Sequence, residues 1–335
     1  MSNRDIGFSL WLDFIERDFL ENEFNGLLKG GIVTGATSNP AIFASAINKS
    51  EAYKEQLDSL KGKSPKEKYE ALAIQDIKSC AKQLRGCYNE CDDGYISIEV
   101  DPTLANDTQK TLDEARRLFK AIGEPNVMIK IPATEAGYKA MSTLMAEGIS
   151  VNATLVFSPA QAKECMDAMT QGIAKGEVDG SCRVEGVVSV FVSRFDRLLD
   201  NELKEKGITP SKTGIYNALN IYKMIEDNGI ANIRTLFAST GVKGDNLPKD
   251  YYITNLVVPH SINTAPLDTI NSYIESKTNS EDVAIRPISD KEIEDYFLDL
   301  EYAGIDIQKV YNSLLQDGLD AFEKAFKEML ENLKD

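Results

Sequence analysis

Residues 126–134 read Asn-Val-Met-Ile-Lys-Ile-Pro-Ala-Thr, a short apolar run with one lysine, Lys130, in its middle. The run follows the loop signal Gly-Glu-Pro-Asn at 123–126, and its β-branched and apolar residues predict a strand. A strand that is apolar on both faces is typical of a parallel sheet covered by helices. An amine in such a place loses hydration, which favours its neutral form, a nucleophile toward carbonyl groups. Lys130 could also reach solvent from a strand end or pair with a carboxylate, so this stretch alone leaves both interpretations open.

Strand-like runs recur along the whole chain and alternate with helical patterns. The predicted strands cover residues 8–12, 31–35, 95–100, 127–131, 149–157, 184–191, 234–238 and 255–258. The predicted helices that follow them include 16–28, 107–121, 194–205, 211–226 and 262–275, with C-terminal helices at 290–300 and 307–333. Further helices are predicted to begin at Asn39, which precedes Pro40, at the capping boxes of Ser64 and Ser158, and at Thr134.

Regular alternation of strands and helices means parallel strands joined by crossover helices. Eight such units in one chain predict the α/β class and a closed (β/α)8 barrel. An open doubly wound sheet would carry a glycine-rich phosphate loop after its first strand. Gly30 and Gly31 instead precede a predicted strand. We therefore expect a single barrel domain over residues 1–335, with the C-terminal helices in 290–334 packed on the barrel.

The composition of the chain limits which classes of binding partner we expect. Of 335 residues, 37 are basic and 53 acidic, giving a net charge of −16, which argues against nucleic acid or an anionic membrane as partner. No signal peptide and no apolar run of about 18 residues is present, so we expect a cytoplasmic protein. A small anionic molecule is not excluded, because a pocket is decided by its own few residues.

The cysteines and the single histidine give little support to a metal site. The five cysteines are odd in number and match no disulfide framework. Cys80, Cys87 and Cys91 have helix-compatible spacing, which favours a buried helix face over metal binding. His260 is the one histidine, so a zinc site has few ligands to draw on. We expect no metal.

Polar residues at the carboxyl ends of the predicted strands are the candidate site. In a closed barrel these ends share one mouth. The residues are Asp13, Asn39, Glu99, Lys130, Thr154, Ser189, Arg194 and Ser239. Each alone has an ordinary explanation, such as a helix cap or a solvated face. Their joint position suggests Schiff-base chemistry, in which an amine attacks a carbonyl group.

The roles follow from what that reaction requires. A positioned acid such as Glu99, acting with Thr154 through one water, could protonate the carbinol oxygen. Asp13 could take the proton of a substrate hydroxyl and trigger cleavage of a carbon–carbon bond. Arg194, with Ser239 and Lys243, is suited to a phosphate group because a guanidinium forms strong charge-assisted hydrogen bonds.

The residues resemble the transaldolase family at two signatures. These are Thr-Ser-Asn-Pro-Ala-Ile-Phe at 37–43, and Val-Met-Ile-Lys-Ile-Pro-Ala-Thr at 127–134 with Gly137. Four supporting matches occur in order: Leu-Asp at 12–13, Ile-Glu-Val-Asp at 98–101, Asn-Ala-Thr-Leu-Val-Phe-Ser at 152–158 and Ser-Val-Phe-Val-Ser-Arg at 189–194. Together they extend along nearly the whole predicted barrel.

The resemblance implies a class I aldolase-type barrel that transfers a dihydroxyacetone unit between sugar phosphates without a cofactor. By position, Lys130 is the Schiff-base lysine, Asp13 the acid/base at the cleaved bond, and Glu99 and Thr154 handle the catalytic water. The dihydroxyacetone hydroxyls would be held by Asn39, Asn152 and Ser189, and the phosphate by Arg194 and Ser239. A monomer and a homodimer are both compatible with the sequence.

One segment departs from the family pattern. Many members carry a second arginine just after the seventh strand, whereas residues 238–243 here read Ala-Ser-Thr-Gly-Val-Lys, similar to the longer-chain branch. Lys243 could supply the missing charge. Three alternatives stay open: an aldolase that releases free dihydroxyacetone from fructose 6-phosphate, a non-catalytic phosphosugar-binding barrel, and a structural protein whose acidic C-terminal helices bind a partner.

Overall fold

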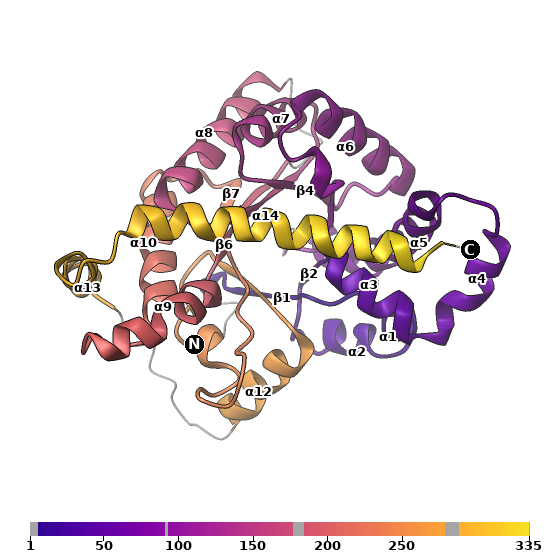
Figure 1. Ribbon diagram of the computed structural model, residues 1–335. Coiled ribbons are helices and arrows are strands. Elements are labelled where there is room, and N and C mark those ends of the chain that lie inside the picture. Colours follow the sequence, from indigo (N-terminus) through magenta and orange to yellow (C-terminus); the bar gives the residue numbers. More distant parts are fainter. Residues whose placement is uncertain (1–5, 91–92, 177–183, 279–287, 335) are drawn as a thin grey trace.

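Eight parallel strands form a closed barrel in the computed structural model, which describes residues 6–90, 93–176, 184–278 and 288–334 (Figure 1). Each strand pairs with the next along the chain, and β1 pairs with β8 to close the ring. The strands are β1 Ser9–Leu12, β2 Gly35–Thr37, β3 Ile96–Glu99, β4 Val127–Pro132, β5 Val151–Val156, β6 Gly186–Phe191, β7 Ile233–Ala238 and β8 Ile262–Ala265. The predicted (β/α)8 barrel is confirmed.

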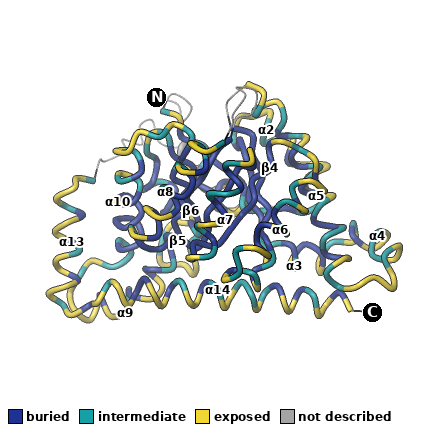
Figure 2. The backbone as a smooth tube through the Cα atoms, turned by 90° about the horizontal axis from the view of Figure 1, so that it is seen from above, coloured by how far each residue is buried: buried dark blue, intermediate teal, exposed yellow. Residues whose placement is uncertain are grey.

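Helices surround the barrel and cover the outer face of the strands, which are buried in the centre of the molecule (Figure 2). The helices near the amino terminus are α1 Arg17–Asn22, α2 Phe24–Lys29, α3 Pro40–Lys49, α4 Lys54–Ser59 and α5 Pro65–Asn89. Those that follow β3 to β7 are α6 Thr108–Ile122, α7 Glu135–Ala146, α8 Pro159–Lys175, α9 Ser193–Glu205, α10 Thr213–Asp227 and α11 Tyr251–Thr254. After β8 come α12 Leu267–Thr278, α13 Asp290–Tyr302 and α14 Ile307–Asn332. None of the helices among the described residues is long and apolar enough to cross a membrane.

The helix starts that the sequence predicts are present. The side chain of Asn39 accepts a hydrogen bond from the backbone of Ile42, and that of Thr134 from Gly137. Ser64 and Ser158 each form the predicted capping box. Satisfying the free amide groups at these helix starts fixes where the chain turns after β2, β4 and β5, and therefore fixes the loops at the barrel mouth.

The predicted second strand, 31–35, is wrong in its position. Gly31 lies just after the end of α2, with a φ of 64° and its amide bonded to the carbonyl of Leu28. Strand pairing begins only at Gly35, where a Cβ atom would lie 2.5 Å from the indole ring of Trp11. A glycine is required there, because any side chain would displace that buried ring.

The predicted eighth strand, 255–258, is also wrong. Leu256 and Val257 are buried, but they lie in a turn after α11 rather than in the sheet. The eighth strand is Ile-Asn-Thr-Ala at 262–265, at the start of what the sequence predicts as a helix. Its polar side chains are buried, and the side-chain oxygen of Asn263 accepts a hydrogen bond from Thr240. Two of its four residues are polar, so its sequence lacks the apolar run from which the other strands were predicted.

Two smaller expectations also change. The predicted helix 16–28 is two helices, α1 and α2, with Glu23 at their junction. Cys80 is buried on α5, whereas Cys87 is only partly buried. Cys91 lies outside the described residues.

Helix α14 crosses the front of the barrel in Figure 1 from α13 to the neighbourhood of α5. It contacts α3, α5, α9 and β5. Val310, Leu314 and Phe326 of its apolar stripe are buried. The helix therefore spans elements from both halves of the barrel.

Candidate active site

Glu99, Lys130 and Asn152 lie side by side on three neighbouring strands. Glu99 pairs with Lys130 between β3 and β4, and Lys130 pairs with Asn152 between β4 and β5. The Lys130 amine lies 3.9 Å from Oε2 of Glu99 and donates a 3.3 Å hydrogen bond to the carbonyl of Ser38. Lys130 is only 6% exposed, so its side chain does not reach bulk solvent. The structure therefore excludes a Lys130 side chain that extends to solvent, and it places the buried amine within ion-pair distance of Glu99.

Asp13 follows the end of β1 and belongs to the same charged cluster. Its Oδ1 atom accepts a 2.7 Å hydrogen bond from the hydroxyl of Thr37, which also lies 2.6 Å from the hydroxyl of Thr264. Burial raises the pKa of Asp13, while the positive charge of Lys130 and the Thr37 hydrogen bond oppose that rise. Asp13, Glu99 and Lys130 therefore interact electrostatically at the barrel mouth.

Burial alters the acidity of Glu99 as well. Burial raises the pKa of Glu99 to about 7; Lys130 opposes this rise, and the negative charge of Asp13 adds to it. Neither oxygen of Glu99 forms a hydrogen bond, and neither does the buried hydroxyl of Thr154. Buried polar atoms without partners are rare and costly, so their presence here indicates groups kept for a ligand or a water.

The strand that carries Thr154 is irregular at the next residue. The register of β5 against β6 shifts between Ala153 and Val156, and Leu155 has a φ of 58°. A left-handed backbone is unfavourable for a bulky residue, and such strain gathers at functional sites. Bulges also re-aim side chains beside active sites. The irregularity at Leu155 is therefore part of how β5 presents Thr154.

A chain of buried hydrogen bonds holds the amide of Asn152. Ser189 on β6 donates a 2.6 Å hydrogen bond to its oxygen, and its nitrogen donates a 2.9 Å bond to the hydroxyl of Ser97. Ser97 was not predicted as a site residue. Its position two residues before Glu99, on the same face of β3, is the signal that could have identified it.

Asn39 caps helix α3 directly after β2. Its side-chain oxygen caps α3, which leaves the amide nitrogen for other partners. The residue before it, Ser38, supplies the carbonyl that binds Lys130. Ser38 and Thr37 fall inside the first family signature, but their contacts with Lys130 and Asp13 were not predicted.

Arg194 lies in the first turn of α9, just after β6. Its guanidinium lies 5.1 Å above the ring of Phe191 and packs against Gly318 of α14. Burial lowers the pKa of Arg194, and the charge of Arg197 adds to this effect while Asp317 opposes it. A guanidinium with its water partly removed binds an anion more strongly than an exposed one.

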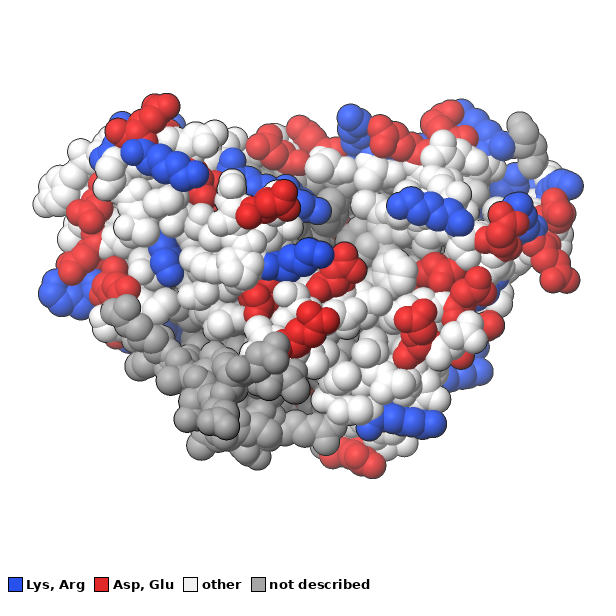
Figure 3. Space-filling view, turned by 90° about the horizontal axis from the view of Figure 1, so that it is seen from below, with Lys and Arg blue, Asp and Glu red and all other residues white. Residues whose placement is uncertain are grey.

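Ser239 and Lys243 follow the seventh strand. Ser239 has a φ of 56°, and its hydroxyl lies 3.1 Å from that of Ser193. Lys243 lines a groove of 440 Å³ together with Ser193, Arg197 and Lys204, between α9 and the loop after β7. Figure 3, which looks onto the side of the molecule that carries α9 and α12, shows basic side chains beside a hollow. Lys243 therefore shares a groove with Arg197, which was not predicted.

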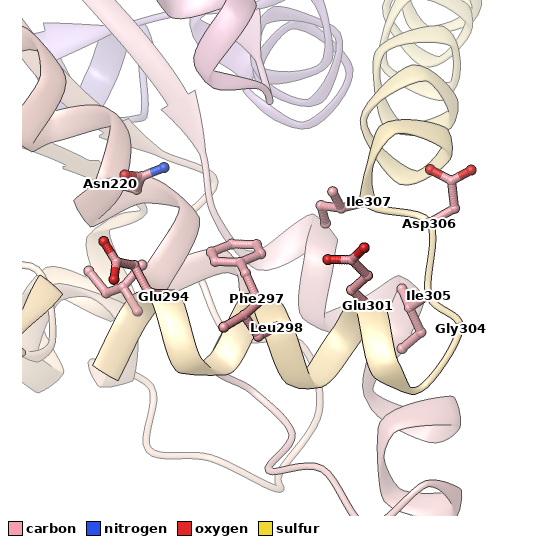
Figure 4. A pocket seen from close by; sticks show the side chains of 10 residues that line it. Asn220, Glu294, Phe297, Leu298, Glu301, Gly304, Ile305, Asp306 and Ile307 are labelled. Atoms are coloured by element: carbon pink, nitrogen blue, oxygen red, sulfur yellow. The ribbon is translucent and has the colours of Figure 1, made fainter. Parts of the chain in front are cut away.

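A larger groove of 830 Å³ lies elsewhere, between α10, α13 and the start of α14 (Figure 4). Its lining is apolar, with Phe297, Leu298 and Ile305, and its edge carries Glu294 and Glu301. It contains none of the candidate site residues, and it brings no nucleophile next to a base. The chemistry is therefore assigned to the barrel mouth.

A closed barrel with a buried lysine between two carboxylates at the carboxyl ends of its strands defines a barrel enzyme. The chain belongs to the Transaldolase/Fructose-6-phosphate aldolase family, whose model matches residues 10–333.

Two similar proteins carry the name transaldolase. A transaldolase of Campylobacter jejuni subsp. doylei is 47% identical over 333 residues, covering 97% of this chain and 99% of the relative. A transaldolase of Helicobacter pylori strain ATCC 700392 / 26695 is 44% identical over 325 residues, covering 96% of this chain and 98% of the relative. The similarity extends over nearly the full length of each relative.

Proposed function

We propose that the protein is a transaldolase that works through a Schiff base on Lys130. It transfers a dihydroxyacetone unit from a ketose phosphate, sedoheptulose 7-phosphate or fructose 6-phosphate, to glyceraldehyde 3-phosphate or erythrose 4-phosphate. This reaction belongs to the non-oxidative pentose phosphate pathway. The observation that carries the proposal is the Lys130 amine, buried 3.9 Å from Glu99 in a chain that matches the family over residues 10–333.

The first stage is formation of the imine. The amine of Lys130 attacks the ketone carbon of the donor, and the carbinol oxygen must be protonated before it leaves as water. Glu99 is suited to this step because its pKa of about 7 keeps a fraction of the carboxyl groups protonated near neutral pH. The unpaired hydroxyl of Thr154 is available to orient the water that carries the proton.

The second stage is cleavage and transfer. The protonated imine is an electron sink, so removal of the proton from the donor's C4 hydroxyl by Asp13 breaks the bond between C3 and C4. The aldose phosphate leaves, and an enamine stays on Lys130. Addition of the enamine to a new aldehyde, with the proton returned by Asp13, and hydrolysis of the imine release the product. The Thr37 hydrogen bond orients Asp13 for both transfers.

The remaining candidates bind the substrate. Asn39, Asn152 and Ser189 would hold the hydroxyl groups of the dihydroxyacetone unit. Arg194, Ser239 and Lys243 would bind the phosphate. The partially dehydrated guanidinium of Arg194 supports its role. Lys243 shares its groove with Arg197 and Lys204, and Asp196 and Asp200 line the same groove.

Three features of the wider protein belong to the same proposal. Residues 1–335 form one domain on which the helices in 290–334 pack. The partners are small sugar phosphates rather than nucleic acid or membranes, as the net charge of −16 favours. The protein acts in the cytoplasm.

The second candidate is an aldolase that releases dihydroxyacetone from fructose 6-phosphate, because the family description names this activity as well. It shares the lysine chemistry and differs in the fate of the enamine. A non-catalytic sugar-phosphate binder is less well supported, since binding does not require a buried amine between two carboxylates.

Reductive trapping tests the proposal directly. The protein is incubated with fructose 6-phosphate and borohydride, digested, and analysed by mass spectrometry. We expect one added dihydroxyacetone or hexose unit on the peptide that contains Lys130, and formation of a seven-carbon phosphate when erythrose 4-phosphate is supplied. Absence of any adduct would refute the Schiff base. An adduct with equal release of free dihydroxyacetone, with or without erythrose 4-phosphate, would favour the aldolase.

A further inference from the structure

The ring of Phe322 covers the amine of Lys130. The centroid of the ring lies 5.9 Å from Nζ of Lys130 and 6.5 Å from the ring of Phe191. Phe322 belongs to α14, far from the barrel strands in sequence, and is itself partly buried. An apolar ring from a helix that crosses the barrel is thus the neighbour of the candidate nucleophile.

A glycine allows α14 to approach this closely. A Cβ atom on Gly318, one turn before Phe322, would lie 2.9 Å from Cδ2 of Leu155 and 3.3 Å from a nitrogen of Arg194. Glycine inside a helix costs about 0.5–1 kcal/mol relative to alanine. The close contact with β5 and α9 is a physical reason for that residue at this position.

Contacts beyond Phe322 hold the same helix in place. Phe326 packs edge-on against Tyr69 of α5 with ring centroids 5.6 Å apart. The buried amine of Lys68 donates a 3.0 Å hydrogen bond to the carbonyl of Leu333, at the end of α14. The position of Phe322 over Lys130 is therefore fixed from both sides.

We propose that Phe322 is a specificity-determining residue that keeps water from the enamine on Lys130. It thereby directs the dihydroxyacetone unit to an acceptor aldehyde instead of releasing it. This inference rests on the proposed function, because it concerns the fate of the intermediate which that function requires.

The two fates differ in where a proton goes. In transfer, the enamine carbon bonds to the aldehyde carbon, and the aldehyde oxygen takes the proton held by the acid/base. In release, the enamine carbon takes a proton from water instead. Hydrolysis of the resulting imine then consumes one water, frees dihydroxyacetone and restores the amine. Only the second route needs water at that carbon, so an apolar cover over the nitrogen favours the first.

The test is a series of variants that remove the ring stepwise: Phe322→Leu, Phe322→Val and Phe322→Ala. With fructose 6-phosphate and erythrose 4-phosphate, the ratio of free dihydroxyacetone to transfer product is measured in D₂O by NMR. We expect Phe322→Ala to raise this ratio about tenfold, equivalent to about 1.4 kcal/mol between the two barriers. Phe322→Leu should stay near the unmodified protein, and the released dihydroxyacetone should carry solvent deuterium.

Met329→Ala is the control, because it removes a buried apolar side chain from the far end of the same helix. It should leave the ratio unchanged. An unchanged ratio throughout the Phe322 series would overturn the inference, and so would an equal rise in Met329→Ala. Borohydride trapping of each variant separates this result from the proposed function: loss of the adduct in the unmodified protein contradicts the function, whereas normal trapping with an unchanged ratio contradicts only the role of Phe322.

Discussion

The two ends of the candidate site are built differently. Glu99, Lys130 and Asn152 stand on neighbouring strands, paired in register and almost completely buried. The residues proposed to bind phosphate stand on a helix start and a loop: Arg194 lies in the first turn of α9, and Lys243 lines a groove beside it. One end is fixed by the sheet, and the other by local turns and packing.

The difference follows from what each end must do. Covalent chemistry requires atoms held within about 0.5 Å of a productive geometry, which strands provide better than loops. Binding a phosphate depends on charge and on several replaceable hydrogen bonds. Substitutions at the strand-borne end should therefore reduce the rate of chemistry, and substitutions at the other end should chiefly weaken binding.

The largest effect is expected at Lys130. Lys130→Ala should lower turnover about 10⁴-fold or more, because no other group can form the imine. The control is the far-ultraviolet circular dichroism spectrum, which should be that of the unmodified protein. Measurable transfer with an intact fold would mean that the nucleophile is another residue.

Asp13→Asn should act on the cleavage step alone. Loss of a positioned acid/base is expected to slow transfer about 10³-fold while trapping of the donor on Lys130 persists. Rapid-quench measurement of trapping and of transfer separates the two steps. If both fall equally, Asp13 acts on imine formation and its assigned role is wrong.

Glu99→Gln links the chemistry to stability. The pKa of Glu99 is about 7 in the folded protein, above its ordinary value of 4.5, so protonation stabilises the fold and stability is lost as pH rises between these values. The neutral glutamine avoids this loss. We expect imine formation to be slowed about 100-fold, and the free energy of unfolding at about pH 8 to rise by roughly 2 kcal/mol.

Urea unfolding at about pH 8 and at about pH 4 measures this change, and the difference between variant and unmodified protein should be small at the lower pH. A variant that is less stable than the unmodified protein at about pH 8 would contradict the assigned acidity of Glu99.

Arg194→Ala tests the helix-borne end. The KM for phosphorylated donors should rise about 10- to 100-fold with a smaller change in kcat, since a charge-assisted hydrogen bond is lost. The reaction of unphosphorylated fructose is the control and should be unaffected. Equal losses for both sugars would argue against a phosphate contact.

The smallest effect is expected at Lys243. Lys243→Ala should raise the same KM about three- to tenfold, the cost of one partly exposed charge. Lys204→Ala is its matched control, because Lys204 lines the same groove from the end of α9. A KM change no larger than that of the control would remove Lys243 from the site.

The part of the site that stands on strands could be predicted from the sequence, because the last residues of the predicted strands were expected to lie close together. Lys130 inside an apolar run and Glu99 at the end of another were enough, since a closed barrel brings all such ends together. The helix caps at Asn39 and Thr134 were predictable for the same local reason.

The parts that could not be predicted depend on long-range contacts. Strand β8 is half polar, and the hydrogen bonds of its buried Asn263 oxygen and Thr264 hydroxyl come from Thr240 and Thr37, elsewhere in the chain. Phe322 is one of several apolar residues on its helix, and nothing local distinguishes it from Phe326. Its place above Lys130 is determined by how α14 packs across the barrel.

The pairing of β1 with β8 has a consequence for how the chain is made. Residues 9–12 must wait for residues 262–265 to leave the ribosome before the ring can close. At about 5–20 residues per second the delay is roughly tens of seconds, during which β1 presents an unpaired edge. The nascent chain therefore has a long interval in which chaperones could bind, and the helix bearing Phe322 emerges only after every strand has been synthesised.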